Sequence, residues 1–220
     1  MAPVRPQRRL SKEARREQLV TAAMPVVAEQ GFGDASLEEI AERADVTRNL
    51  LYHYFPRGRT DVVLAVVERA GAELSGDWVI DEELPLPERL AANFGRMLDH
   101  ALAPSDAWRI YRQARSAGQP EIEEIVTRYA ERVIASVSLN HLQTAEPPPL
   151  THIALTGFVA YAEAALDEAR TTKASREQVM QLLSDTLVAT IRASRPARSR
   201  QREPVSRGPR RTRRPRSDGG

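Results

Sequence analysis

The amino-acid sequence predicts an all-α fold. Apolar residues recur every three or four positions through most of residues 11–194, and no alternating apolar–polar run of useful length occurs in the 220 residues. Hydrophobic residues make up 41% of the chain and charged residues 28%, which supplies enough apolar side chains for a buried core. Glycine, proline and capping residues divide the periodic segments, and we expect these segments to form two helical domains, at 11–75 and 76–194.

The chain begins with a segment rich in arginine and proline, and residues 1–10 are predicted to form a flexible basic arm. A helical pattern starts near Ser11 and ends at Gly31, where glycine favours a helix end. Pro25 lies inside this helix and removes one backbone hydrogen bond, so we expect a kink there.

Three further helices complete the predicted first domain. Ser36 and Glu39 have the spacing of a capping box, in which the serine hydroxyl accepts a backbone N–H and the glutamate reaches back to the cap. Thr47 follows a two-residue turn and is placed to cap the next helix. The expected helices are 37–44, 47–55 and 61–74.

Longer amphipathic segments follow Gly76, and they predict helices at 87–102, 106–117, 121–142, 149–170 and 175–193. Ser175 and Gln178 form a second capping box at the start of the last one. Small residues such as Gly157 and Ala164 allow helices to approach closely, and we expect that a two-fold partner supplying the same helices, 149–170 and 175–193, would complete a four-helix homodimer interface.

Charge is distributed unevenly along the chain. Residues 1–16 carry a net charge of +5 and residues 195–220 a net charge of +8, whereas residues 17–194 carry −11. Both ends are therefore attracted to a polyanion, and the tail at 195–220, with ten arginines, is predicted to be disordered. The stretch 46–60 has no acidic residue and a net charge of +3.

Two short helices joined by a tight turn predict a helix-turn-helix, whose second helix enters the DNA major groove. Its first turn contains Arg48, which can pair with guanine, and Asn49, which can pair with adenine. Tyr52 and His53 lie one turn further along, where side chains contact phosphate. A capped helical hairpin without DNA contacts is the alternative, and a solvated face is the alternative for His53.

Several function classes are excluded by composition. The chain has no cysteine, its four histidines show no metal-ligand spacing, and it has no nucleophile elbow or phosphate-binding glycine loop. We therefore expect no metal, no cofactor and no enzyme activity. No apolar run approaches the ~20 residues that span a bilayer, so we expect no membrane association and a cytoplasmic location.

With these residues in view, the first third of the chain, about residues 11–72, resembles the TetR family of transcriptional regulators. The resemblance rests on four runs in this order and spacing: Ala22-Ala23 through Glu29-Gln-Gly-Phe32, Ser36-Leu-Glu-Glu-Ile-Ala41, Ala44-Asp-Val-Thr47 and Leu51-Tyr-His-Tyr-Phe-Pro56. It implies an all-α homodimer with an N-terminal three-helix DNA-binding domain and a C-terminal domain that dimerises and usually binds a small ligand. Ligand binding in such proteins releases the DNA operator.

The resemblance also assigns roles by position. It implies phosphate contacts from Thr47 and Tyr52 and base contacts from Arg48 and Asn49. The further phosphate candidates are Ser36, Thr21, and Arg57 or Arg59, the arginines standing in for a lysine that usually follows the recognition helix.

Asp45 stands where the family usually has a turn glycine, and aspartate tolerates the left-handed backbone conformation at modest cost.

A ligand pocket is expected in the second domain, although aromatic residues at helical spacing also fit an ordinary core. The candidate lining residues are Trp78, Phe94, Met97, Trp108, Tyr111, Tyr129, Phe158 and Tyr161. The interpretation that follows is a homodimeric repressor released from its operator by a small-molecule effector. The alternative is a transcriptional activator or an architectural DNA-binding protein with the same helix-turn-helix.

Overall fold

The structure is a computed structural model, and it describes residues 10–76, 83–102 and 105–194. Three of the sequence expectations fall outside the described residues. They are the basic arm apart from Leu10, the arginine-rich tail at 195–220, and the pocket candidate Trp78.

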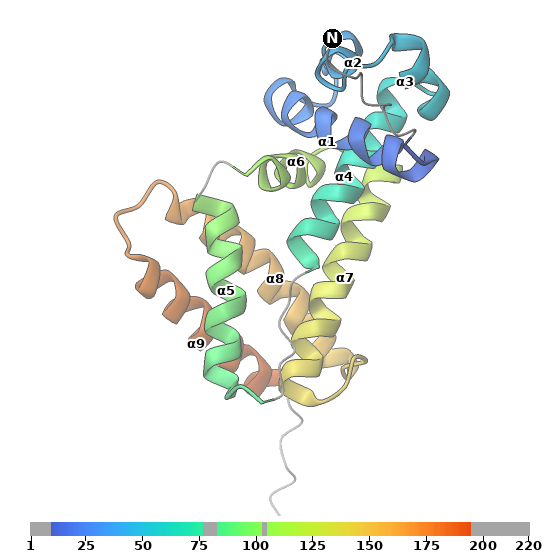
Figure 1. The fold of residues 1–220 in the computed structure, drawn as a ribbon. Coiled ribbons are helices and arrows are strands. Elements are labelled where there is room, and N and C mark those ends of the chain that lie inside the picture. Colours follow the sequence, from blue (N-terminus) through green and yellow to red (C-terminus); the bar gives the residue numbers. More distant parts are fainter. Residues whose placement is uncertain (1–9, 77–82, 103–104, 195–220) are drawn as a thin grey trace, which may run out of the picture.

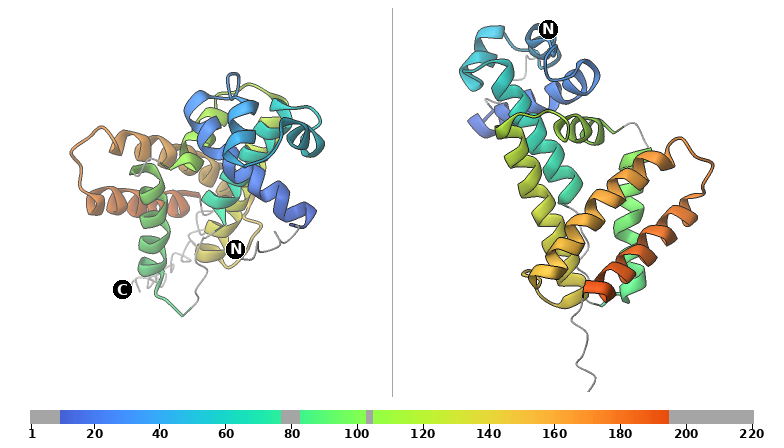
Figure 2. Two further views of the ribbon diagram at one scale, coloured as in Figure 1. Left: turned by 45° about the horizontal axis from the view of Figure 1, so that its top comes forward. Right: turned by 180° about the vertical axis from the view of Figure 1, so that it is seen from behind.

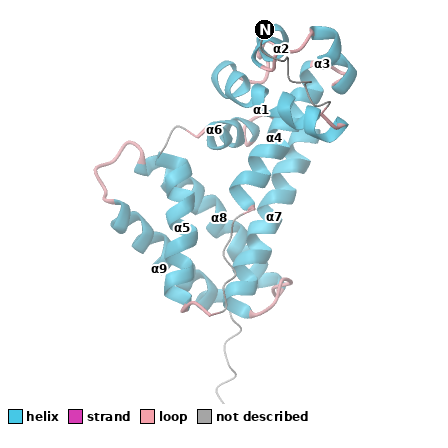
Figure 3. Ribbon diagram, in the orientation of Figure 1, coloured by secondary structure: helices cyan, strands magenta, loops and turns pink. Residues whose placement is uncertain are grey.

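Within the described residues the fold is all-α, as predicted, and Figure 3 shows helices and loops without a strand there. The nine helices of this part are α1 Lys12–Gln30, α2 Leu37–Arg43, α3 Arg48–Tyr54, α4 Arg59–Ser75, α5 Leu86–Leu102, α6 Asp106–Ala114, α7 Pro120–Leu142, α8 Pro149–Ala169 and α9 Arg176–Ser194. α6 ends three residues earlier than expected, and the chain then turns through Gly118, whose φ of 62° lies in the left-handed region. α1 continues through Pro25 as a single helix.

Side-chain caps fix where the helices begin. The Ser11, Ser36 and Thr47 hydroxyls each accept the backbone N–H of the third helical residue, at 3.1, 3.2 and 3.3 Å. The box at Ser175 is reciprocal, as predicted: Gln178 N–H donates to the Ser175 hydroxyl at 3.3 Å, and Ser175 N–H donates to Gln178 Oε1 at 2.8 Å.

The box at Ser36 is only half formed, which corrects the expectation for Glu39. Ser36 N–H donates to Oε1 of Gln30 at 2.9 Å instead, and Nε2 of Gln30 donates to the Glu39 carboxylate at 2.6 Å. Gln30 thus bridges the end of α1 and the start of α2. The side chain of Gln30, six positions before Ser36, has therefore replaced that of Glu39 as the acceptor.

Two hydrophobic clusters form the core. One is built from α1, α2, α3 and α4 together with α6 and the first half of α7. The other is built from α5, α8, α9 and the second half of α7, with Trp108 of α6. Figure 1 shows α4 and α7 running side by side between the two regions, with α6 lying across them, and the view from behind in Figure 2 agrees.

Candidate nucleic-acid interface and ligand cavity

The turn between α2 and α3 is fixed by backbone conformation and by one long-range hydrogen bond. Asp45 has a φ of 52°, which confirms the left-handed conformation expected where a glycine is usual. Gln18 on α1 donates from Nε2 to the carbonyl oxygen of Ala44 at 2.8 Å. The entry angle of α3 is therefore set by α1 as well as by the turn.

One face of α3 is anchored in the core and the other is open. Leu51 is fully buried, and Phe55 closes the end of the helix beneath the guanidinium of Arg16, which lies 5.4 Å from its ring centre. The predicted DNA-contacting side chains of this helix and its cap are all exposed: Thr47, Arg48, Asn49, Tyr52 and His53. The structure therefore brings them together on one surface, at the end of the molecule opposite α5 and α9 (Figure 1).

Arg48 has partners on this surface. Its Nη2 donates to the Tyr52 hydroxyl at 3.2 Å, its Nη1 forms an ion pair with Glu38 on α2, and its guanidinium lies over the Tyr52 ring. Tyr52 is in turn supported from behind by Gly58, where a Cβ atom would come within 3.1 Å of the tyrosine ring. Arg48 must therefore exchange Glu38 for a base in order to read DNA.

The two arginines expected to replace a phosphate-binding lysine make contacts within the protein. Arg59 donates to the carbonyl oxygens of Gly33 and Ala35 and holds the α1–α2 loop against α4. Arg57 forms ion pairs with Asp61 at 2.6 Å and with Glu121 of α7 at 2.9 Å. Burial alone would raise the pKa of Asp61, but hydrogen bonds from the Arg57 backbone and guanidinium lower it.

The remaining phosphate candidates lie on other elements. Thr21 is exposed on α1. Ser36 is half-buried at the start of α2, and its hydroxyl accepts from Glu39 N–H, which leaves its own hydrogen available to donate. The part of the chain that the structure describes contains no group of three residues able to hold a metal ion and no helix long and apolar enough to cross a membrane.

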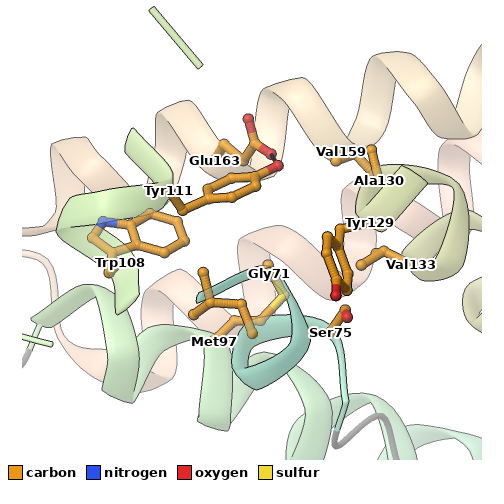
Figure 4. A pocket seen from close by; sticks show the side chains of 11 residues that line it. Gly71, Ser75, Met97, Trp108, Tyr111, Tyr129, Ala130, Val133, Val159 and Glu163 are labelled. Carbon is orange, nitrogen blue, oxygen red and sulfur yellow. Dashed lines mark hydrogen bonds between the residues drawn. The ribbon is translucent and has the colours of Figure 1, made fainter. Parts of the chain in front are cut away.

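A cavity lies where α4, α5, α6, α7 and α8 meet. It contains about 430 Å³ of space outside the protein atoms, of which only about 40 Å³ admits the centre of a water molecule. A water needs about 10–15 Å³ measured in this way, so the cavity has room for about three waters in this conformation. Figure 4 shows its lining: Gly71, Leu74, Ser75, Met97, Trp108, Tyr111, Tyr129, Ala130, Val133, Val159 and Glu163.

The wall formed by α6 and α8 carries the polar contact of the cavity. The Tyr111 hydroxyl donates to Oε1 of Glu163 at 2.8 Å, and Arg115 approaches the other carboxylate oxygen at 3.2 Å from a more exposed position. Burial and the neighbouring Glu163 charge raise the pKa of Tyr111, so its hydroxyl stays protonated and donates at neutral pH.

The cavity includes four of the predicted pocket residues: Met97, Trp108, Tyr111 and Tyr129. Phe94 and Phe158 do not line it, because they pack against each other in the second core cluster with ring centres 6.0 Å apart. Tyr161 is 38% exposed on the outer side of α8 and does not line it either.

The other seven lining residues were not predicted from the sequence: Gly71, Leu74, Ser75, Ala130, Val133, Val159 and Glu163. Gly71 and Ser75 lie on α4, in the segment assigned to the DNA-binding domain. Glu163 could have been predicted from the sequence. Histidine aside, it is the only acidic or basic residue between Pro149 and Leu166. An isolated carboxylate in an apolar helix predicts a buried polar contact.

Comparison with known proteins assigns this arrangement to a family. The profile described as "Bacterial regulatory proteins, tetR family" matches residues 19–66, which include α2, the turn and α3. A tetR-family transcriptional regulator from Streptomyces coelicolor has the same fold, with a TM-score of 0.68 and 24% identity, covering 84% of this chain and 90% of the other. The segment that contains α2, the turn and α3 therefore belongs to the TetR family of DNA-binding domains.

Two curated relatives extend the comparison. The HTH-type transcriptional activator FasR of Mycolicibacterium smegmatis is 39% identical over 61 residues, which are 28% of this chain and 27% of FasR. The HTH-type transcriptional regulator BetI of Escherichia coli is 28% identical over 130 residues, which are 56% of this chain and 66% of BetI. The match spans about a quarter of FasR and just under two thirds of BetI. TetR-family proteins are DNA-binding regulators rather than enzymes, in agreement with the sequence analysis.

Proposed function

We propose that this protein is a homodimeric transcriptional repressor that binds a near-palindromic operator and is released by a small-molecule effector. The observation that carries the proposal is the exposed first turn of α3, where Arg48 and Asn49 stand beside the phosphate-type contacts Thr47 and Tyr52. These side chains suit base and phosphate recognition respectively. Because the operator lies on the chromosome, the proposal places the protein in the cytoplasm.

The release step is supported by α4. This helix begins at Arg59, directly after the turn that follows α3, and ends at Ser75, which lines the cavity. The cavity is too narrow in this conformation for a molecule larger than a few waters. A bound effector must therefore displace its walls, and a displacement of α4 changes the position of α3 relative to a second copy.

The homodimer is supported by the outward face of α8. Ile153 is 67% exposed and Tyr161 is 38% exposed, and a Cβ atom added to Gly157 between them would meet no other atom within 4 Å. Apolar and small side chains on one helix face allow close two-fold packing. α9 adds Leu182, which is 50% exposed.

The test of DNA reading compares two amide substitutions. Asn49→Ala is expected to lose ~1–3 kcal/mol of discrimination at one base pair per half-site. Gln119→Ala, which removes an exposed amide at the start of α7, is the matched control and should leave operator preference unchanged. Fluorescence anisotropy with an operator selected from random duplexes measures both. Unchanged preference in the Asn49 variant would show that bases are read elsewhere.

The dimer is tested by sedimentation. Ile153→Asp places a charge on the proposed interface and should yield a folded monomer, whereas Leu102→Asp, at an exposed apolar position on α5, should leave the dimer intact. A dimer that survives the Ile153 substitution contradicts the proposed interface.

Activation is the second candidate function, because FasR, which is 39% identical over 61 residues, is named an activator. Transcription from a reporter carrying the selected operator separates the two: repression lowers output when the protein is supplied, and activation raises it.

A further inference from the structure

We infer that the cavity selects hydrophobic amines, that is, ligands with an aromatic or aliphatic body and a single positive charge at neutral pH. The inference rests on the proposed function, since it names the chemical class of the effector. It assigns the charged group of the ligand to the end of the cavity formed by Trp108, Tyr111 and Glu163, and the apolar body to the end formed by Tyr129 and Val133 (Figure 4).

The first argument is the charge of the lining. Glu163 is 7% exposed, and it is the only acidic or basic side chain among the described residues that line the cavity. Its counter-charge, Arg115, is 40% exposed and so is largely hydrated, which weakens its interaction with the carboxylate. A buried carboxylate favours a second cation nearby and strongly disfavours an anion.

The second argument is the placement of the aromatic rings. Cations are attracted to the faces of tryptophan and tyrosine rings, most strongly where water is excluded. The rings of Trp108 and Tyr111 lie beside Glu163, with centres 6.4 Å apart. Tyr129 at the other end already has the guanidiniums of Arg128 and Arg132 at 5.6 and 4.9 Å from its ring centre. The Tyr129 ring is thus already occupied by two cations, one of which, Arg128, is paired with Glu68, so the rings at the Trp108 end are the ones open to a ligand cation.

The third argument is an unsatisfied polar atom. The Ser75 hydroxyl oxygen lines the cavity, is buried, and has no hydrogen-bond partner in the protein. Buried hydroxyls without partners are uncommon and point to a missing partner such as a water or a ligand. Met97 of α5 also lines the cavity, and its unbranched side chain, which adapts to a new shape, is the one best able to move when a ligand enters.

The experiment uses three probes that share one ring system and differ in charge. They are 1-naphthylmethylamine, 1-naphthalenemethanol and 1-naphthaleneacetate, titrated calorimetrically into the full chain without DNA. We expect the amine to bind about tenfold or more tightly than the acetate, with the alcohol between them, because only the amine gains from both the carboxylate and the rings. Equal affinities, tighter binding of the acetate, or no binding of the amine overturns the inference.

Two variants separate recognition from structural support. Glu163→Gln and Arg115→Gln both break the same ion pair, so a purely structural role predicts that both weaken binding alike. Recognition predicts opposite effects: the amine's advantage over the acetate falls to about twofold or less in the Glu163 variant and rises in the Arg115 variant. Circular dichroism checks that each variant is folded. If one is not, the affinities of the three probes for the wild-type chain still test the inference.

The outcome is distinguishable from failure of the proposed function. An amine that binds in this way but does not displace operator DNA contradicts effector release and leaves the selectivity of the cavity intact. Loss of amine selectivity with normal operator binding contradicts only the effector class.

Discussion

Gly71 is the position where the structure makes the sharpest stability prediction. It lies on α4 against the ring of Tyr129 on α7, and a Cβ atom added there would stand 2.3 Å from Cδ2 and 2.6 Å from Cε2 of that ring. Carbon atoms pack at about 3.5–4.0 Å, so the Gly71→Ala substitution requires the ring to retreat by more than ~1 Å.

The ring has little freedom to do so. The Tyr129 hydroxyl donates to Glu68 on α4 at 3.0 Å, and the side chain is 7% exposed. Overpacking of this kind costs about 1–3 kcal/mol, and the hydrogen bond at the ring's far end places this case near the upper value. Alanine recovers ~1 kcal/mol of helix propensity relative to glycine, which leaves a net destabilisation of about 2 kcal/mol. For a chain of this length the melting temperature should fall by about 4–8 °C.

Urea denaturation followed by circular dichroism measures the free energy of unfolding at fixed protein concentration. The control is the same substitution in a Tyr129→Ala background, where the clash is absent and the sign should reverse, with Gly71→Ala stabilising the protein by up to ~1 kcal/mol. A Gly71→Ala protein at least as stable as wild type would refute the packing described between α4 and α7.

Three further substitutions test the DNA-binding surface and the helix caps. Tyr52→Phe removes a hydroxyl that accepts from Arg48 and is placed for phosphate. Affinity for all duplex sequences should therefore fall together, without a change in base preference. A shifted preference would assign Tyr52 to base reading. Glu38→Gln removes the ion-pair partner of Arg48 and one negative charge near the phosphates. Binding to DNA, measured by anisotropy titration, should therefore tighten severalfold. Weaker binding would mean that Glu38 orients Arg48 on DNA. Ser175→Ala removes the cap of α9 and should cost ~1 kcal/mol in urea denaturation, and an unchanged midpoint would count against the reciprocal box.

The helix-turn-helix could be predicted because its determinants are local. The Thr47 cap, the left-handed Asp45 and the apolar anchor Leu51 act within a few residues of one another, and each has the predicted conformation or burial. The prediction was incomplete where a side chain outside the motif competes for the same partner. Gln30, on the preceding helix, takes the N–H that Glu39 was expected to bind, and the spacing within residues 36–39 does not indicate it.

The cavity was predicted less well, for a similar reason. Phe94 and Phe158 have the same local signature as Trp108 and Tyr111, and only the packing of α5 against α8 places the two phenylalanine rings against each other instead of in the cavity lining. Arg57 likewise has a basic, exposed sequence context, but Glu121 is brought to it by α7 from 64 positions away. Periodicity identifies which face of a helix is buried, and it does not identify the neighbour on that face.

The central claim is that α3, presented twice by a two-fold dimer, reads duplex DNA. Selection of bound sequences from a random duplex pool, with the wild-type chain and Asn49→Ala in parallel, tests it most directly. We predict enrichment of near-palindromic sites whose half-sites are separated by about one helical turn of DNA or a multiple of it, with relaxed preference at one position per half-site in the variant. Enrichment without two-fold symmetry, or identical preferences from both proteins, would contradict the claim.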